Sequence, residues 1–251
     1  MPETWTPLVA GAVVAGVLIY GFSKTAMPVA GVLAGPLLAL AVGATEAAGL
    51  LVPLLILGDL FGLAYYRQHA DWGLIRRLVP GLLAGFVVTA ILFALLSTEA
   101  LGRVIGVLIL GSVLLEVWRR WQERRGVDQA PMTSRLGIAF FGTLAGMTTM
   151  AANAGGAAMT LYLVKMRVPM LSFMGTATWF FFILNLIKVP VVVGLGFLTP
   201  ATLLADLWLS PLIVVGALLG VVAFRRMNEK MFTYTALVLS GIVAVWLVIH
   251  G

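Results

Sequence analysis

The sequence predicts an all-α polytopic membrane protein of two inverted repeats, each a broken-helix hairpin followed by three transmembrane helices. The 251 residues have a mean hydropathy of +1.08, 61% of them are hydrophobic, and only 10% are charged. A soluble domain averages about 25% charged residues. The hydrophobic residues also fall in long runs, two of which are interrupted by polar or small residues.

Six stretches are long and apolar enough to cross a bilayer as single helices, which needs about 20 predominantly apolar residues. Charges are rare inside them. Asp59 lies within the first stretch, and Arg103 and Glu116 lie near the ends of the third. The predicted spans are residues 47–66, 78–97, 101–118, 170–187, 207–224 and 231–249.

Two further apolar stretches, residues 8–45 and 136–164, are interrupted. Polar residues and a proline break the first at residues 23–28, and Asn153-Ala154-Gly155-Gly156 breaks the second. Irregular backbone at membrane depth is tolerated only where protein or a water-filled cavity satisfies its polar groups. We therefore expect both stretches to enter the membrane and return to the same side. For residues 8–45, two complete crossings stay open as an alternative.

The distribution of Lys and Arg predicts the orientation. Thirteen of the 16 fall in loops that a single topology places on one side. The positive-inside bias makes that side cytoplasmic and both termini extracytoplasmic, in a bacterial inner membrane. The first six residues lack the Lys or Arg of a signal peptide, so we expect the N-terminus to belong to the mature protein. Loop bias does not explain Lys24, Arg103 and Lys188, which makes these three cations informative.

Composition also excludes several kinds of chemistry. The chain has no Cys and two His, which argues against disulfides, thiol chemistry and a multi-histidine metal site. We expect no cofactor, no metal and no enzymatic activity. The net charge of +6 is assigned to cytoplasmic loops and not to a nucleic-acid partner. The expected partners are the lipid bilayer and a small anionic substrate, and a homodimer is left open.

The same topology predicts an internal repeat. Residues 1–118 and 136–251 each contain one hairpin and three spans, and residues 119–135 form a basic cytoplasmic loop between them. Gly49 precedes Asp59 by ten residues, as Gly175 precedes Asn185. The first half starts outside and the second inside, so inversion would relate them. Inverted repeats with interrupted helices are a recurrent plan of secondary transporters, with the substrate near the breaks.

Lys24 at the first break is the first candidate site residue. A cation at that depth costs at least about 2.5–3.5 kcal/mol when it faces lipid, so we expect it to face a cavity, a carboxylate or an anion. Ser23 and Thr25 flank it with hydroxyl donors, and broken helices present free N–H groups to anions. The alternative is that Lys24 reaches the interface from a shallow hairpin.

The second break supplies Thr149, Asn153 and Gly155. We expect Thr149 and Asn153 to line the same cavity, and the glycines to let backbone amides approach a ligand closely. For Gly155 and its neighbour Gly156, packing of helices through small residues is an equal alternative.

Four further ionisable or polar residues lie inside the spans or at their ends. Asp59 is the first candidate for a proton carrier and Asp206 is the second. The alternative role for Asp59 is a structural ion pair with Lys24 or Lys188. Asn185 corresponds to Asp59 in the repeat. Asn185 and Lys188 share a helix face because they are three residues apart. Lys188 could instead mark the outer interface.

Several segments resemble the TauE/SafE sulfite-exporter family, also called the toluene sulfonate uptake permeases. They are the Gly58-Asp59 segment at residues 54–62, residues 66–72 and 76–80, the second break at residues 142–156, and residues 175–181 and 185–188. The similarity covers nearly the whole chain. It implies the family's architecture and an association with sulfite, sulfonate and related small organosulfur anions.

The first hairpin departs from the family pattern. Many members are glycine-rich there, whereas this chain has Tyr20-Gly21-Phe22-Ser23-Lys24-Thr25. A lysine replaces what would otherwise be bare backbone amides, and this strengthens the interpretation that an anion binds.

These observations predict a secondary transporter that moves sulfite, an organosulfonate or a similar anion by alternating access. Export is favoured, because an inside-negative membrane drives an anion outward without a coupled ion. The alternative is proton- or cation-coupled uptake of an organosulfonate or another small carboxylate or oxyanion. Two remote alternatives are an intramembrane aspartyl protease using Asp59 and Asp206, and a membrane scaffold without transport.

Overall fold

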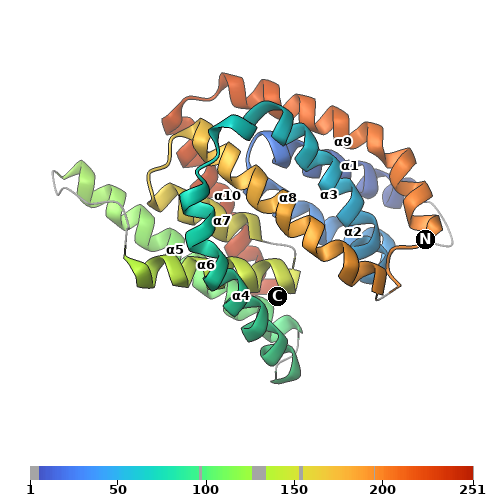
Figure 1. Ribbon diagram of the computed structural model, residues 1–251, viewed down its shortest axis with the longest axis horizontal. Helices are drawn as coiled ribbons and strands as arrows, with labels where there is room; N and C mark the ends of the chain where they lie inside the picture. The colour runs from blue at the N-terminus through green and yellow to red at the C-terminus, as the bar shows by residue number, and fades with distance from the viewer. Residues whose placement is uncertain (1–5, 96–97, 126–133, 153–154, 195, 251) are drawn as a thin grey trace. The chain divides into compact units, whose positions relative to one another are not determined.

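The described part of the chain is helical and contains no strand, which confirms the predicted all-α class. The computed structural model describes residues 6–95, 98–125, 134–152, 155–194 and 196–250. Its elements are α1 (Pro7–Thr25), η1 (Pro28–Leu33), α2 (Ala34–Val42), α3 (Ala44–Tyr66), η2 (Arg67–His69), α4 (Trp72–Leu95), α5 (Thr98–Arg124), α6 (Arg135–Ala152), α7 (Gly155–Lys165), α8 (Met170–Gly194), α9 (Pro200–Arg226) and α10 (Glu229–His250) (Figure 1).

Six described segments are long and apolar enough to cross a membrane. They are Pro7–Thr25, Gly49–His69, Trp72–Thr89, Met170–Gly194, Pro200–Arg226 and Glu229–Ile249. The first of them is α1, the leading arm of the predicted hairpin. The predicted span at residues 101–118 lies within α5 and stays a prediction.

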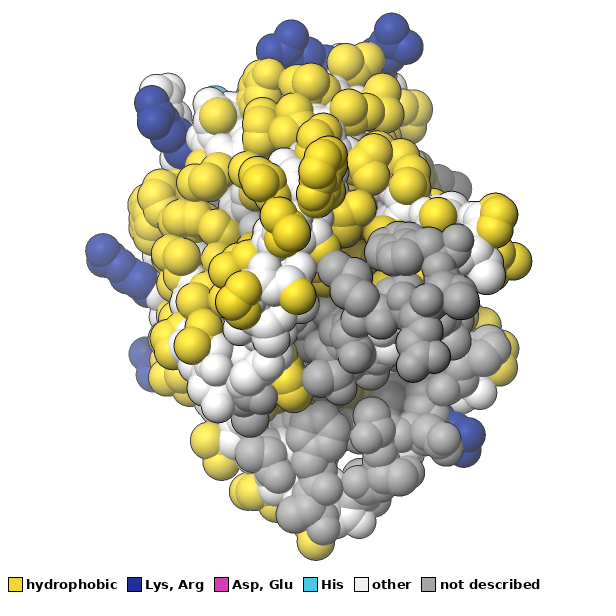
Figure 2. Space-filling view, turned by 90° about the vertical axis from the view of Figure 1, so that its right-hand side faces the viewer, with side chains coloured by type: hydrophobic (Ala, Val, Ile, Leu, Met, Phe, Trp, Pro, Cys, Tyr) yellow, Lys and Arg dark blue, Asp and Glu magenta, His cyan; other side chains and the backbone are white. Residues whose placement is uncertain are grey.

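Large apolar side chains cover much of the outer surface. On α4, Leu83, Val87 and Ile91 are each more than half exposed and recur every fourth residue, so they form one stripe. Among the described side chains on the face shown in Figure 2, hydrophobic ones predominate. Water would penalise such a surface, whereas acyl chains would not.

The helices group into two compact units. Unit 1 comprises Met1–Asp71 and Leu171–Met227, and unit 2 comprises Trp72–Met170 and Asn228–Gly251. Each unit therefore takes helices from both predicted repeats. A unit is defined by packing and a repeat by equivalence of sequence, so the repeat boundaries stay a prediction.

In unit 1 the chain reverses direction after α1. The helix starts at Pro7, capped by the Thr6 side chain, and ends at Thr25. Met27 is extended, and the following Pro28 opens η1. The returning segment lies against α1, because a β-carbon added at Gly31 would lie 2.6 Å from the Ser23 hydroxyl oxygen. Farther from the turn, a β-carbon added at Gly16 of α1 would lie 2.8 Å from Leu38 Cγ of α2. The two arms are therefore antiparallel.

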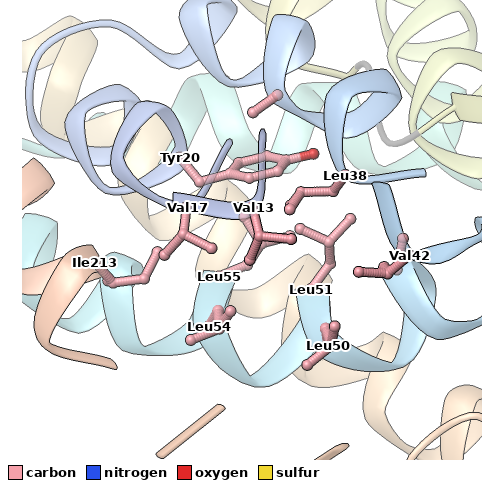
Figure 3. Packing of buried hydrophobic residues seen from close by; sticks show 12 residues of the cluster. Val13, Val17, Tyr20, Leu38, Val42, Leu50, Leu51, Leu54, Leu55 and Ile213 are labelled. Atoms are coloured by element: carbon pink, nitrogen blue, oxygen red, sulfur yellow. The ribbon is translucent and has the colours of Figure 1, made fainter. Parts of the chain in front are cut away.

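The core of unit 1 lies where α1, α2, α3 and α9 meet. Val13, Val17 and Tyr20 of α1 lie in one cluster with Leu38 of α2 and Leu51 of α3 (Figure 3). Further members are Val42, Leu50, Leu54, Leu55 and Ile213. This cluster supports the end of α1 that carries Lys24.

Glycines set the spacing between α1 and α9, which lie side by side (Figure 1). A β-carbon added at Gly21 would overlap the carbonyl oxygen of Ile213, and one added at Gly216 would overlap that of Leu18. Small residues allow two backbones in a membrane to approach this closely. Gly216 lies between Leu18 and Phe22, and Gly220 one turn later lies between Phe22 and Ala26, so α1 and α9 are parallel.

Unit 2 repeats this contact between α4 and α6. A β-carbon at Gly146 would overlap the Leu82 carbonyl oxygen, and one at Gly85 would overlap that of Thr143. The contact of Gly146 with Leu82 corresponds to that of Gly21 with Ile213, and the contact of Gly85 with Thr143 corresponds to that of Gly216 with Leu18. In both cases α6 matches α1 and α4 matches α9 at the same difference in residue number. The correspondence agrees with the predicted repeat, which stays a prediction.

Helix α7 is enclosed within unit 2. All eleven of its residues, from Gly155 to Lys165, are buried. Gly155 packs against the Thr149 side chain of α6, and Lys165 lies 5.5 Å from the ring centre of Phe141. The α7 helix is thus antiparallel to α6, as α2 is to α1.

Candidate functional site

The charged residue at the first break is paired inside unit 1. Lys24 Nζ lies 2.7 Å from Asp59 Oδ1, and the two side chains are 9% and 0% exposed. Lys24 therefore faces a carboxylate, one of the partners that the sequence analysis left open, and it does not reach the surface. Removing water from both charges is costly, and the short contact together with further hydrogen bonds offsets part of that cost.

Asn185 of α8 satisfies the second carboxylate oxygen. Its Nδ2 donates a hydrogen bond to Asp59 Oδ2 over 2.7 Å, and Asn185 is 2% exposed. The equivalence of Asp59 and Asn185 was proposed from sequence spacing, and the two side chains are in direct contact. Three helices, α1, α3 and α8, thus contribute one residue each.

Lys188 adds a second cation. It interacts electrostatically with both Asp59 and Lys24. Two lysines and one carboxylate give this group a formal excess of one positive charge. Phe181 of α8 lies under the first lysine, with its ring centre 5.4 Å from Lys24 Nζ. We call Lys24, Asp59, Asn185, Lys188 and Phe181 the lysine cluster.

Two glycines of α3 make room for the pair. A β-carbon at Gly58 would lie 2.9 Å from Lys24 Cγ, and one at Gly62 would lie 2.9 Å from the Lys24 carbonyl oxygen. The Gly58-Asp59 sequence therefore combines space for the lysine side chain with the carboxylate that binds it. This explains physically why the two residues are adjacent.

The hydroxyls beside Lys24 have backbone partners. Ser23 Oγ donates to the Tyr20 carbonyl oxygen over 2.7 Å, and Thr25 Oγ1 donates to that of Ala217 over 2.6 Å. Both residues lie next to Lys24. In this conformation, however, their hydrogens point at carbonyl oxygens and would have to rotate to serve an anion.

Sequence reasoning missed several supporting residues. Tyr66 donates to the Thr25 carbonyl oxygen over 2.8 Å and so ties the end of α1 to α3. Thr178 packs against Gly62, and Phe181 lies under Lys24. Spacing could have revealed Phe181, because residues four and three apart, such as Phe181, Asn185 and Lys188, occupy one helix face.

The second predicted group lies in unit 2. Thr149 is 4% exposed and Gly155 packs against its hydroxyl, so these two are together. Thr148 donates to the Leu144 carbonyl oxygen over 2.8 Å. Asn153 lies outside the described residues. Grouping these residues with Lys24 in one site stays a prediction.

Asp206 is buried elsewhere in unit 1. It is 6% exposed, and neither carboxylate oxygen has a hydrogen-bond partner among the described residues. It precedes Ile213, which lies beside Gly58, by seven residues or about 10 Å of helix. Asp59 already binds Lys24 and Asn185. The described geometry thus gives no support to a carboxylate pair sharing a proton, as an aspartyl protease requires.

Apolar helices of membrane length around a buried charged cluster define a multi-pass membrane protein. A family comparison makes this specific, since the model of the family described as "Sulfite exporter TauE/SafE" matches residues 8–247. The chain belongs to this family and is a membrane transporter. No curated protein and no solved structure matches the chain. The resemblance found in the sequence is thereby confirmed.

Proposed function

We propose that the protein exports a small sulfur-containing anion, sulfite or an organosulfonate, across the bacterial inner membrane by alternating access, and that the lysine cluster binds this anion. The observation that carries the proposal is the excess of positive charge on the buried Lys24 and the half-buried Lys188 around a single buried carboxylate. Cations inside a membrane are costly and are retained where they serve transport.

The anion would compete with Asp59 for Lys24. Its oxygens would accept hydrogen bonds from the Lys24 ammonium, the Asn185 amide and Lys188, which are the donors that a sulfonate group needs. The single excess charge matches a monoanion. Protonation of Asp59 would raise the excess to two and suit a dianion such as fully ionised sulfite.

The membrane potential supports export. Moving one charge across 100 mV is worth about 2.3 kcal/mol, or a concentration ratio of about fifty, and an inside-negative potential drives an anion out. Uptake needs a coupled cation. Asp59 remains the first candidate to carry a proton, and the burial of Asp206 without a hydrogen-bond partner among the described residues favours it as the second. Proton-coupled uptake is therefore the second candidate function.

Alternating access rests on the predicted inverted repeat. The matching glycine contacts of α1 with α9 and of α6 with α4 support that repeat. Thr149, Asn153 and Gly155 at the second break are proposed to contribute to the transport path.

The test is flux in proteoliposomes with an imposed potential. We expect sulfite or an organosulfonate to move toward the positive side faster than in protein-free vesicles. Lys24→Met should abolish this flux, whereas Arg103→Met, which removes an exposed cation on α5, should not. Flux equal to that of empty vesicles for both anions, in both directions, would contradict the proposal.

A further inference from the structure

A groove between α5 and α10 in unit 2 has no assigned role. The two helices are antiparallel, since Gly106 lies against Val248 and Gly241 lies opposite Val113. The groove encloses about 480 Å³, and all of its wall except one basic residue, Arg120, is apolar or aromatic. Representative lining residues are Leu114, Val117, Leu237, Val238 and Gly241. We call it the α5–α10 groove.

A second, polar cavity of about 640 Å³ adjoins one end of the groove. It is lined by Arg120, Glu123, Glu229, Lys230, Thr233 and Tyr234. Arg120 and Tyr234 line both spaces, so an apolar channel opens directly onto a charged one. The junction lies at the end of α5 that leads into the basic segment following Arg120.

The polar cavity is lined by two cations, Arg120 and Lys230, and two carboxylates, each of which has a partner other than these cations. Arg120 Nε bonds to the fully buried Glu116 over 2.9 Å, Arg167 pairs with Glu123, and Glu229 accepts a hydrogen bond from the Met170 amide. Lys230 has no carboxylate within ion-pair distance among the described residues. The guanidinium of Arg125 lies 3.5 Å from the centre of the Trp121 ring beside the groove.

The dimensions fit one lipid chain. From Arg120 to Leu110 the groove follows α5 for ten residues, or about 15 Å. The hydrocarbon core of a bilayer is about 30 Å thick, so one leaflet contributes about 15 Å. With Arg120 at the predicted cytoplasmic interface, the groove would extend over about the thickness of one leaflet. Basic pockets between transmembrane helices on the cytoplasmic side bind anionic lipid head groups.

We infer that the α5–α10 groove and the adjoining polar cavity bind one anionic phospholipid, with an acyl chain along Val117 and Gly241 and the phosphate at Arg120 and Lys230. Glu116 positions Arg120 by binding its Nε, which leaves the terminal nitrogens of the guanidinium for the phosphate. Tyr234, at the junction, lies where head group and chain meet.

Two variants test the two halves of this site. Gly241→Leu fills the groove without touching a charge, because the nearest side-chain atom to an added β-carbon is 3.9 Å away. Its control is Gly111→Leu on α5, where nothing lies within 4 Å and which does not line the groove. Lys230→Gln removes a head-group cation, and its control is Arg226→Gln, an exposed cation outside the cavity.

The measurement is native mass spectrometry of the purified protein with phosphatidylglycerol or phosphatidylcholine, alongside thermal unfolding without lipid. We expect one phosphatidylglycerol to bind in preference to phosphatidylcholine. Gly241→Leu should abolish retention, and Lys230→Gln should weaken it about fivefold, the change equivalent to about 1 kcal/mol for one cation. Both controls should bind like the native protein, and all four variants should unfold near the native temperature.

Three results would overturn the inference. If the Gly241→Leu variant still retained phosphatidylglycerol, the groove would not be the binding site of the acyl chain. Equal stabilisation by inorganic phosphate would identify an anion site without a lipid. A dimer that Gly241→Leu dissociates, with no lipid bound, would identify a second copy of the chain as the occupant.

Discussion

Removing Asp59 alone should destabilise the protein more than removing both partners of the Lys24–Asp59 pair. Breaking a buried ion pair from one side costs about 3–5 kcal/mol, because the other charge stays buried. The loss of stability for Asp59→Asn should lie near the upper end of this range, because the variant leaves two lysines without their carboxylate. Lys24→Met should lie near the lower end, because Asn185 still donates to Asp59 and Lys188 stays nearby.

The double variant Lys24→Met/Asp59→Asn removes both charges of the pair. It should lose less stability than Asp59→Asn alone, so with single effects of about 5 and about 3 kcal/mol the coupling energy should exceed about 3 kcal/mol. The assay is reversible unfolding in mixed micelles for the native protein, both single variants and the double variant. Arg103→Met serves as the control and should stay within about 0.5 kcal/mol. If the two single effects simply add, the pair contributes no interaction energy, and our account of the cluster is wrong.

Three further predictions address other parts of unit 1. Tyr66→Phe should lower the free energy of unfolding by about 1 kcal/mol, because the hydrogen bond to the Thr25 carbonyl is lost; the same unfolding assay measures it. Gly21→Leu should lower the unfolding temperature strongly, because the new side chain overlaps the backbone of α9. The control Gly111→Leu should leave the unfolding temperature unchanged, and equal effects of the two variants would contradict the close contact between α1 and α9. Asp206→Asn should leave potential-driven anion export intact but abolish any uptake driven by a proton gradient; vesicle uptake that persists would remove Asp206 from coupling.

Hydrophobic runs predicted most of the helices but not their ends. The predicted span at residues 78–97 corresponds to α4, which begins at Trp72. The six added residues include Arg76 and Arg77, which hydropathy assigns to a loop. A helix continues wherever its backbone hydrogen bonds continue, so it can extend beyond the apolar region that signals a membrane.

The choice of partners could not be predicted from the sequence. Hydropathy marked Lys24, Asp59 and Lys188 as unusual, but pairing depends on which helices pack together, and the sequence left Lys24 and Lys188 as equal partners for Asp59. The close contacts of Gly58 and Gly62 with Lys24 show where the selection arises. Only the packing of α1 on α3 reveals that Gly58 and Gly62 leave space for Lys24.

The hydroxyl groups show a second limit. Ser23 and Thr25 were expected to donate hydrogen bonds to a ligand, because they flank a cation. A serine or threonine near a helix end can instead bond to a carbonyl three or four residues earlier, as Ser23 does with Tyr20, or to a neighbouring helix, as Thr25 does with Ala217. The choice depends on local backbone geometry that the residue types do not encode.

The enclosure of α7 has a consequence for hydrogen exchange. A helix with no solvent-facing side releases its amide protons only when its surroundings open, so deuterium should enter the segment from Ala157 to Val164 later than any other part of unit 2. The exchange rate of α7 therefore reports the opening free energy of the whole unit. A ligand that tightens unit 2 would slow that exchange even without touching α7.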